Sequence, residues 1–90
     1  MSFEILKAPA ARKVLAVSHG RFFEWRKKQL VPLPVQISAR SIGYPSDELL
    51  AVARARVAGW SDEQIADLVR RMAAKRGALA QMAAEHAGAE

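Results

Sequence analysis

The segment "LVPLPVQISARSIGYPSDEL", residues 30–49, differs in pattern from the sequence on both sides of it. Pro32 and Pro34 favour extended backbone at their own positions and at the residue before each, so any preceding helix ends here. After the prolines, apolar residues alternate with polar or small residues as far as Tyr44. A period of two is typical of half-buried strands. The segment therefore predicts a short extended element in a chain that is otherwise helical in pattern.

The predicted element is a β-hairpin that turns at residues 38–41. Two strands of this length are not stable alone in water. We expect them to pack against the helices through one apolar side, made of Val35, Ile37, Ile42 and Tyr44.

Two helices are expected before the hairpin. Residues 8–17 form the first, with Pro9 in its first turn, where the missing N–H is harmless. Ser18 is expected to cap the second, which runs to residue 29. Because the join at residues 16–18 is very short, the two helices must turn sharply, as in a helix-turn-helix. A hairpin packed on such a pair is a wing.

Two helices are also expected after the hairpin. Ser46 is expected to cap the third, whose buried side extends to Val57, and Gly59 is expected to end it. Ser61 and Gln64 match a capping box at the start of the fourth. The expected fold is mainly α: a MerR-like winged helix-turn-helix at residues 1–59, with a two-stranded β-hairpin wing, followed by a C-terminal helical tail at residues 60–90.

The tail carries an apolar stripe with two interpretations. It either folds back and enlarges a core that would otherwise be marginal, or it packs against another protomer. The residues of the stripe are Ile65, Leu68, Met72, Leu79 and Met82.

Composition and charge bound the possible functions. The chain has 90 residues and no cysteine, which excludes disulfides and thiolate metal sites and fits a reducing cytoplasm. No apolar run approaches the roughly 20 residues of a membrane span, so no membrane partner is expected. The net charge is +5 and is unevenly placed: residues 1–45 have a net charge of +6, and residues 46–90 have a net charge of −1. A basic half indicates a polyanion partner such as nucleic acid, and the alternative is surface charge that serves solubility.

No pattern in the sequence indicates catalysis. His19 and His86 lie in different elements, without the Ser or Cys and orienting acid of a nucleophile triad. Metal-ligand spacing and a phosphate-binding glycine loop are also missing. We therefore expect no enzyme activity, no cofactor and no metal.

Double-stranded DNA is the expected partner because a helix fits the major groove and can contact base edges there. Side chains near the start of the second helix enter furthest, and later cations meet phosphates. Phe22 and Trp25 share the apolar stripe and are expected in the core, whereas Phe23 is expected at the edge, against a sugar. The alternative for the charged residues is a solvated surface. The expected DNA contacts are Ser18, His19, Arg21, Phe23, Arg26, Lys27 and Lys28 on the helix, and Ser38, Arg40 and Ser41 at the wing turn.

Residues 6–49, "LKAPAARKVLAVSHGRFFEWRKKQLVPLPVQISARSIGYPSDEL", resemble the AlpA-type, MerR-like winged helix-turn-helix proteins of prophages and integrative elements. Phe23 stands where many members carry a tyrosine at the DNA backbone, and Glu24 departs from a position that is frequently basic. The motifs that carry the resemblance are Pro32-x-Pro34, Arg40, Gly43-Tyr44 and Ser46-x-Glu48.

The resemblance implies an excisionase, also called a recombination directionality factor, or a transcription regulator of the same fold. The chain is also similar to RdfS-type excisionases. An excisionase binds repeated sites beside an attachment site, bends the DNA and directs an integrase toward excision. The implied partners are duplex DNA, further copies of the chain as a dimer or head-to-tail oligomer, and an integrase, in the bacterial cytoplasm at the nucleoid. A protein-interaction adaptor with an incidental basic face is the alternative from another class.

Overall fold

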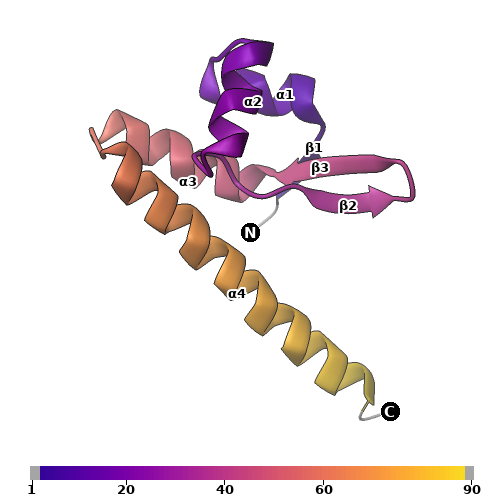
Figure 1. Cartoon of the computed structure of the whole chain (residues 1–90). Helices are drawn as coiled ribbons and strands as arrows, with labels where there is room; N and C mark the ends of the chain where they lie inside the picture. Colours follow the sequence, from indigo (N-terminus) through magenta and orange to yellow (C-terminus); the bar gives the residue numbers. More distant parts are fainter. Residues whose placement is uncertain (1–2, 89–90) are drawn as a thin grey trace.

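The computed structural model describes residues 3–88, with side chains as far as Leu79. Four helices and three short strands make up this part of the chain (Figure 1). Their order is β1 (Ile5–Leu6), α1 (Ala8–Leu15), α2 (His19–Lys27), β2 (Val35–Ser38), β3 (Ser41–Pro45), α3 (Ser46–Val57) and α4 (Asp62–Gly88). The fold is mainly helical with a small antiparallel sheet in the order β1-β3-β2. Among the described residues, no helix is long and apolar enough to cross a membrane.

The join between α1 and α2 is as tight as the sequence predicts. Ala16 adopts the left-handed conformation (φ 56°), and the Val17 N–H donates to the Arg12 carbonyl at 3.2 Å. The Ser18 hydroxyl then caps α2 by accepting a hydrogen bond from the Arg21 N–H at 3.2 Å. A left-handed alanine costs roughly 1–2 kcal/mol, so packing of the two helices must hold this turn.

The hairpin is confirmed, but its predicted single apolar side is wrong. Val35 pairs with Gly43 and Gln36 pairs with Ile42, and residues opposite each other share a face of the sheet. The apolar residues have odd numbers in β2 and even numbers in β3, so they lie on opposite faces. Tyr44 is fully buried, whereas Ile37 and Ile42 are 48% and 38% exposed.

Strand β1 was not predicted, and it changes the role of Ser46. β1 pairs antiparallel with the end of β3. The Ser46 hydroxyl accepts a hydrogen bond from the Glu4 N–H at 2.8 Å, and the Ser46 N–H donates to the Glu4 carbonyl at 2.7 Å. The predicted side-chain cap at Ser46 is therefore wrong, because its hydroxyl binds Glu4, the residue before β1, and the N-cap of α3 is Pro45.

The boundary between α3 and α4 follows the sequence prediction. Gly59 has a positive φ of 82° and lies just beyond the end of α3. The capping box is present, because the Ser61 N–H donates to Gln64 Oε1 at 2.9 Å and the Gln64 N–H donates to the Ser61 hydroxyl at 3.2 Å. Val57, predicted on the buried side of α3, is 90% exposed. Ala55, two residues earlier, lies on the buried side instead.

The core consists of two clusters of buried residues. The first joins α1, α2, β3 and α3 through Ala11, Phe22, Val31, Tyr44 and Leu49. The second joins the segment after α2 to α3 and α4 through Leu30, Val52, Ala55, Ile65 and Val69. The second cluster contains residues from both sides of position 59, so the first half of α4 completes the core of the chain.

The residues of the tail stripe differ in how deeply the rest of the chain buries them. Ile65 is fully buried within the chain, so its predicted role in oligomerisation is wrong: no surface of it is left for a partner. Leu68 and Met72 are half-buried and pack against the second cluster, and Leu79 is 56% exposed. The side chain of Met82 lies outside the described part. The helix runs without a break through Gly77.

Candidate nucleic-acid interface

The outer surface of α2 carries most of the predicted DNA-binding residues. His19, Arg21, Lys27 and Lys28 are all exposed. At about 100° per residue, Arg21 and Lys28 share one side of the helix, and Lys27 lies about 120° away from Arg21. The exposed cations therefore do not form one stripe but are spread over a broad part of the surface of α2.

An aromatic side chain joins two of these predicted residues. The rings of His19 and Phe23 lie 4.7 Å apart between centroids, and the Arg26 guanidinium carbon lies 5.8 Å from the centroid of the Phe23 ring. Phe23 and Arg26 are both half-buried. The position of Phe23 at the edge of the apolar stripe is confirmed, and its contact with a sugar stays a prediction.

The other two aromatic residues of α2 lie inward, as predicted. Phe22 is fully buried and meets Tyr44 edge-on at 5.1 Å between ring centroids. Trp25 is half-buried and packs against both core clusters. The Tyr44 hydroxyl is buried and has no hydrogen-bond partner among the described residues. This burial raises the pKa of Tyr44, and the nearby positive charge of Arg26 partly opposes the shift. Tyr44 and Phe22 thus attach α2 to the sheet.

The hairpin turn presents a second set of predicted contacts. Ala39 and Arg40 form the turn between β2 and β3, and Ser38 pairs with Ser41 at its base. Arg40 and Ser38 are exposed, and Ser41 is half-buried. Figure 1 shows this end of the hairpin projecting beyond the helices. The strands thus carry the tip away from α2.

The two halves of the chain differ in how their cations are paired. Among the described residues, one salt bridge involves a cation of residues 1–45: Lys28 Nζ lies 3.2 Å from Glu24 Oε1. The cations of α3 and α4 are mostly paired, through Arg56–Asp62, Arg70–Asp67, Arg71–Asp67 and Arg76–Glu48. The excess positive charge on α2 and at the hairpin turn is therefore not neutralised within the described part of the chain.

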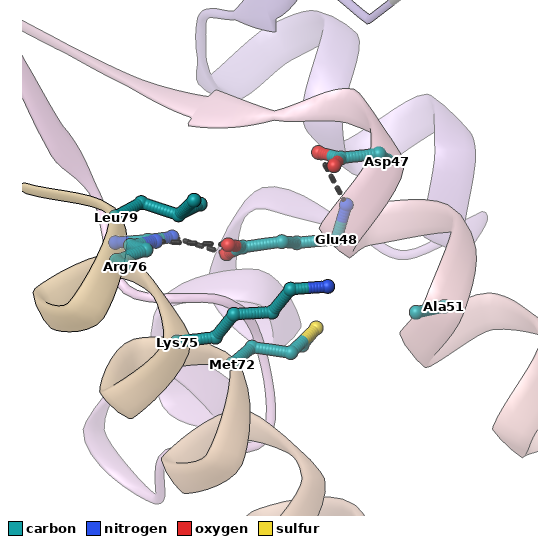
Figure 2. A pocket seen from close by; sticks show the side chains of 7 residues that line it. All are labelled: Asp47, Glu48, Ala51, Met72, Lys75, Arg76 and Leu79. Atoms are coloured by element: carbon teal, nitrogen blue, oxygen red, sulfur yellow. Dashed lines mark hydrogen bonds and ion pairs between the residues drawn. The ribbon is translucent and has the colours of Figure 1, made fainter. Parts of the chain in front are cut away.

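Arg76 has a structural role that the sequence did not indicate. It forms an ion pair with Glu48 at the start of α3 in a pocket between α3 and α4, which Met72 and Leu79 also line (Figure 2). It also donates a hydrogen bond from Nη2 to the Leu33 carbonyl at 2.7 Å. Arg76 therefore connects α4 to the Pro-x-Pro segment before β2. Because its partners are 28 and 43 residues away, no local pattern marks these contacts.

Arg56 near the end of α3 is the second residue that sequence reasoning missed. Its guanidinium carbon lies 4.2 Å from the centroid of the Trp25 ring. It therefore connects α2 to the far end of α3.

No protein-family model, curated protein or solved structure significantly matches the chain.

Proposed function

We propose that this chain is a winged helix-turn-helix protein that binds duplex DNA, with α2 as the recognition helix and the β2–β3 hairpin as the wing. The observation that carries the proposal is the charge pairing. The exposed cations of α2 and the turn mostly lack acidic partners among the described residues, whereas most cations of α3 and α4 have them. Surface charge that served solubility alone would have no reason to be segregated in this way, whereas a DNA-binding face requires free cations.

The two ends of α2 suggest separate tasks for the side chains they carry. His19 and Arg21 lie in the first turn, whose side chains reach furthest into a major groove in helix-turn-helix proteins. Arginine there favours guanine because its two donors match the acceptors O6 and N7. Lys27 and Lys28 lie in and just beyond the last turn of α2 and contact phosphates, which fix the register of the protein on DNA without selecting sequence.

Arg40 at the tip of the wing supplies the second contact. It is exposed on a two-residue turn between Ser38 and Ser41, and such a slender projection fits a groove. A narrow minor groove has enhanced negative potential that attracts arginine. Because the hairpin projects away from α2 (Figure 1), the wing would contact the duplex beyond the segment bound by the helix.

Within this DNA-binding function we propose the role of an excisionase that binds at attachment sites, bends the DNA and promotes excision by an integrase. The alternative is a transcription regulator with the same fold. Leu79 is exposed and Leu68 and Met72 are half-buried, so part of the tail stripe remains for self-association. Several copies on adjacent sites would strengthen weak single-domain binding through avidity. An excision assay with the cognate integrase, with and without this protein, separates the two roles.

Binding to duplex DNA over a range of salt concentrations tests the proposal. We expect the logarithm of the affinity to fall linearly with the logarithm of salt concentration. Arg21→Ala should lose about 1–3 kcal/mol of discrimination between sequences, whereas Lys27→Ala should weaken binding to all sequences and reduce the salt slope by about 1.

Arg70→Ala is the matched control, because Arg70 is an exposed arginine of α4 that is already paired with Asp67. It should bind DNA as the unmodified protein does. A salt slope near zero, or Arg21 and Lys27 variants that bind like the Arg70 variant, would contradict the assignment of α2 as the DNA-binding helix.

A further inference from the structure

Three elements meet at the guanidinium group of Arg56. Its carbon Cζ lies 4.2 Å from the centroid of the Trp25 ring on α2. Its Nη1 donates a hydrogen bond to Asp62 Oδ1 at the start of α4, at 2.9 Å. Arg56 itself belongs to the last turn of α3. One side chain therefore contacts α2 and both helices that support it.

The environment of Arg56 makes the aromatic contact important. Its Nε and Nη2 atoms are buried and have no hydrogen-bond partner among the described residues. Donors removed from water without a partner are costly. The face of an indole ring compensates a nearby cation better than any other side-chain ring does, and the planar guanidinium can stack on it where an ammonium group cannot. Trp25 is therefore the main partner of the buried side of this charge.

The contact between Arg56 and Trp25 affects the direction in which the side chains of α2 point. Trp25 follows Arg21 by four residues, so both lie on the same side of the helix. Trp25 is half-buried at the boundary between the two core clusters, where a side chain resists rotation of the helix about its axis. A clamp on Trp25 therefore restrains the orientation of Arg21.

We infer that Arg56 is a positioning residue for DNA recognition: it clamps Trp25 and thereby fixes the rotation of α2 that presents Arg21 to the bases. The inference rests on the proposed function. Arg56 does not touch DNA in this arrangement, because its Nη1 is engaged by Asp62 and its other nitrogens are buried. Arg54, two residues earlier, is exposed and is a matched control on the same helix.

The experiment compares Arg56→Lys and Arg56→Met with Arg54→Lys and Arg54→Met. Each is made in a Trp60→Phe background, so that Trp25 is the sole tryptophan. The first measurement is the emission spectrum of Trp25 without DNA. The second is the affinity for two duplexes: the best binder selected from a random-sequence pool, and a scrambled duplex of the same composition. Thermal unfolding by circular dichroism identifies the variants that are folded at the assay temperature.

Arg56→Met should shift the Trp25 emission and lower the ratio of selected to scrambled affinity by roughly tenfold, which is the loss of one strong cation–π contact. Arg56→Lys keeps a cation near the ring but loses the planar stacking, so it should shift the emission and lower the ratio by a smaller factor. The salt slopes of both Arg56 variants should equal that of the parent, and the Arg54 variants should keep the parent ratio. Asp62→Asn leaves the stacked pair in place and should lower the ratio less. It provides a second variant if those at Arg56 do not fold.

Two results would overturn the inference. An unchanged affinity ratio with a shifted emission would mean that Arg56 only supports the fold. A reduced salt slope with an unchanged ratio would mean that Arg56 contacts phosphate directly. If the parent protein binds neither duplex, the proposed function and this inference both fail, and the emission spectra then report only on the packing of Arg56 against Trp25.

Discussion

Glu24 is the only acidic side chain of α2, and it reduces the positive charge that this helix presents. Its carboxylate pairs with Lys28 four residues later, and both side chains are well exposed. Exposed pairs of this kind contribute only about 0.3–0.5 kcal/mol to stability. The effect of Glu24 on a bound polyanion is expected to exceed its effect on the fold, because a carboxylate on this surface repels phosphates directly and also occupies Lys28.

We predict that Glu24→Gln tightens binding to duplex DNA by roughly 1 kcal/mol at low salt, or about fivefold. The salt slope should steepen, because Lys28 no longer shares its charge with a carboxylate and neutralises its phosphate more completely. Glu63→Gln, which removes an exposed carboxylate in the first turn of α4, is the control and should change affinity much less. An unchanged or weaker affinity of the Glu24 variant would place Lys28 outside the interface.

The sequence was sufficient to identify single residues where the determining interaction is local. Phe22 and Trp25 were placed in the core from their spacing, and Ser18 was recognised as a cap from its position before a helix. Arg56 could not be identified in the same way. Its partner Trp25 is on another helix. An arginine in the last turn of a helix is ordinarily a solvated charge that interacts favourably with the negative end of the helix dipole.

The hairpin and its neighbour β1 depend on a close approach at Gly43. A Cβ atom at this position would lie 2.5 Å from Ile5 Cγ2, 2.7 Å from Ile37 Cδ1 and 3.2 Å from the Leu6 carbonyl oxygen. The side-chain atoms can move, but the carbonyl belongs to the backbone of β1. Glycine therefore allows β1 and the side chain of Ile37 to cover this point of the sheet.

We predict that Gly43→Ala destabilises the protein by about 1–3 kcal/mol, the usual cost of overpacking. Gly77→Ala is the matched control. A Cβ there meets nothing within 4 Å, and alanine favours a helix, so this variant should be more stable by about 0.5–1 kcal/mol. Urea unfolding of both variants measures these changes. A Gly43→Ala variant as stable as the unmodified protein would contradict the packing described at Gly43.

The attachment of α4 to the rest of the chain includes the pair of Arg76 with Glu48. The exposed fractions of these side chains are 25% and 14%, so water screens this ion pair less than it screens the pair between Arg70 and Asp67. The Arg76 Nε also lies 2.9 Å from Glu48 Oε2, which makes the contact bidentate. Figure 2 shows Arg76 reaching across from α4 toward Glu48.

We predict that Arg76→Met lowers the free energy of unfolding by about 2 kcal/mol, because it leaves the Glu48 carboxylate and the Leu33 carbonyl without a charged donor. Arg70→Met should change it by less than about 0.5 kcal/mol, since its pair with Asp67 is exposed. Urea unfolding monitored by circular dichroism compares the two. Equal effects would show that the Arg76 contacts are no stronger than a surface ion pair.

Elements were predictable where their start and end signals are local. The α1–α2 turn, the hairpin turn and the capping box of α4 all depend on residues a few positions apart. β1 has two residues and no periodicity to detect. The faces of the hairpin were assigned wrongly because the alternation within each strand does not fix the register between the strands. The bond between Ser46 and Glu4 spans 42 residues and has no local signal.

At the scale of the whole molecule, the helix with mostly unpaired cations and the helix with largely paired cations lie in different places. In Figure 1, α1 and α2 lie above the sheet and α3, and α4 lies below them. The helix α2, whose cations are mostly unpaired, thus lies on the opposite side of α3 from α4, whose cations are largely paired. Ile65 and Val69 show why the tail could not be placed from its pattern alone: an apolar stripe has the same spacing whether it faces its own chain or another.

The most direct test of the account is a titration of the protein with its best-binding duplex, followed by the NMR shifts of the backbone amides. We predict that the largest changes occur at residues 18–28 and 38–41, and that residues 62–79 of α4 change much less. The largest changes at residues 62–79, with α2 and the hairpin turn unperturbed, would contradict the proposal that α2 and the hairpin form the DNA-binding surface.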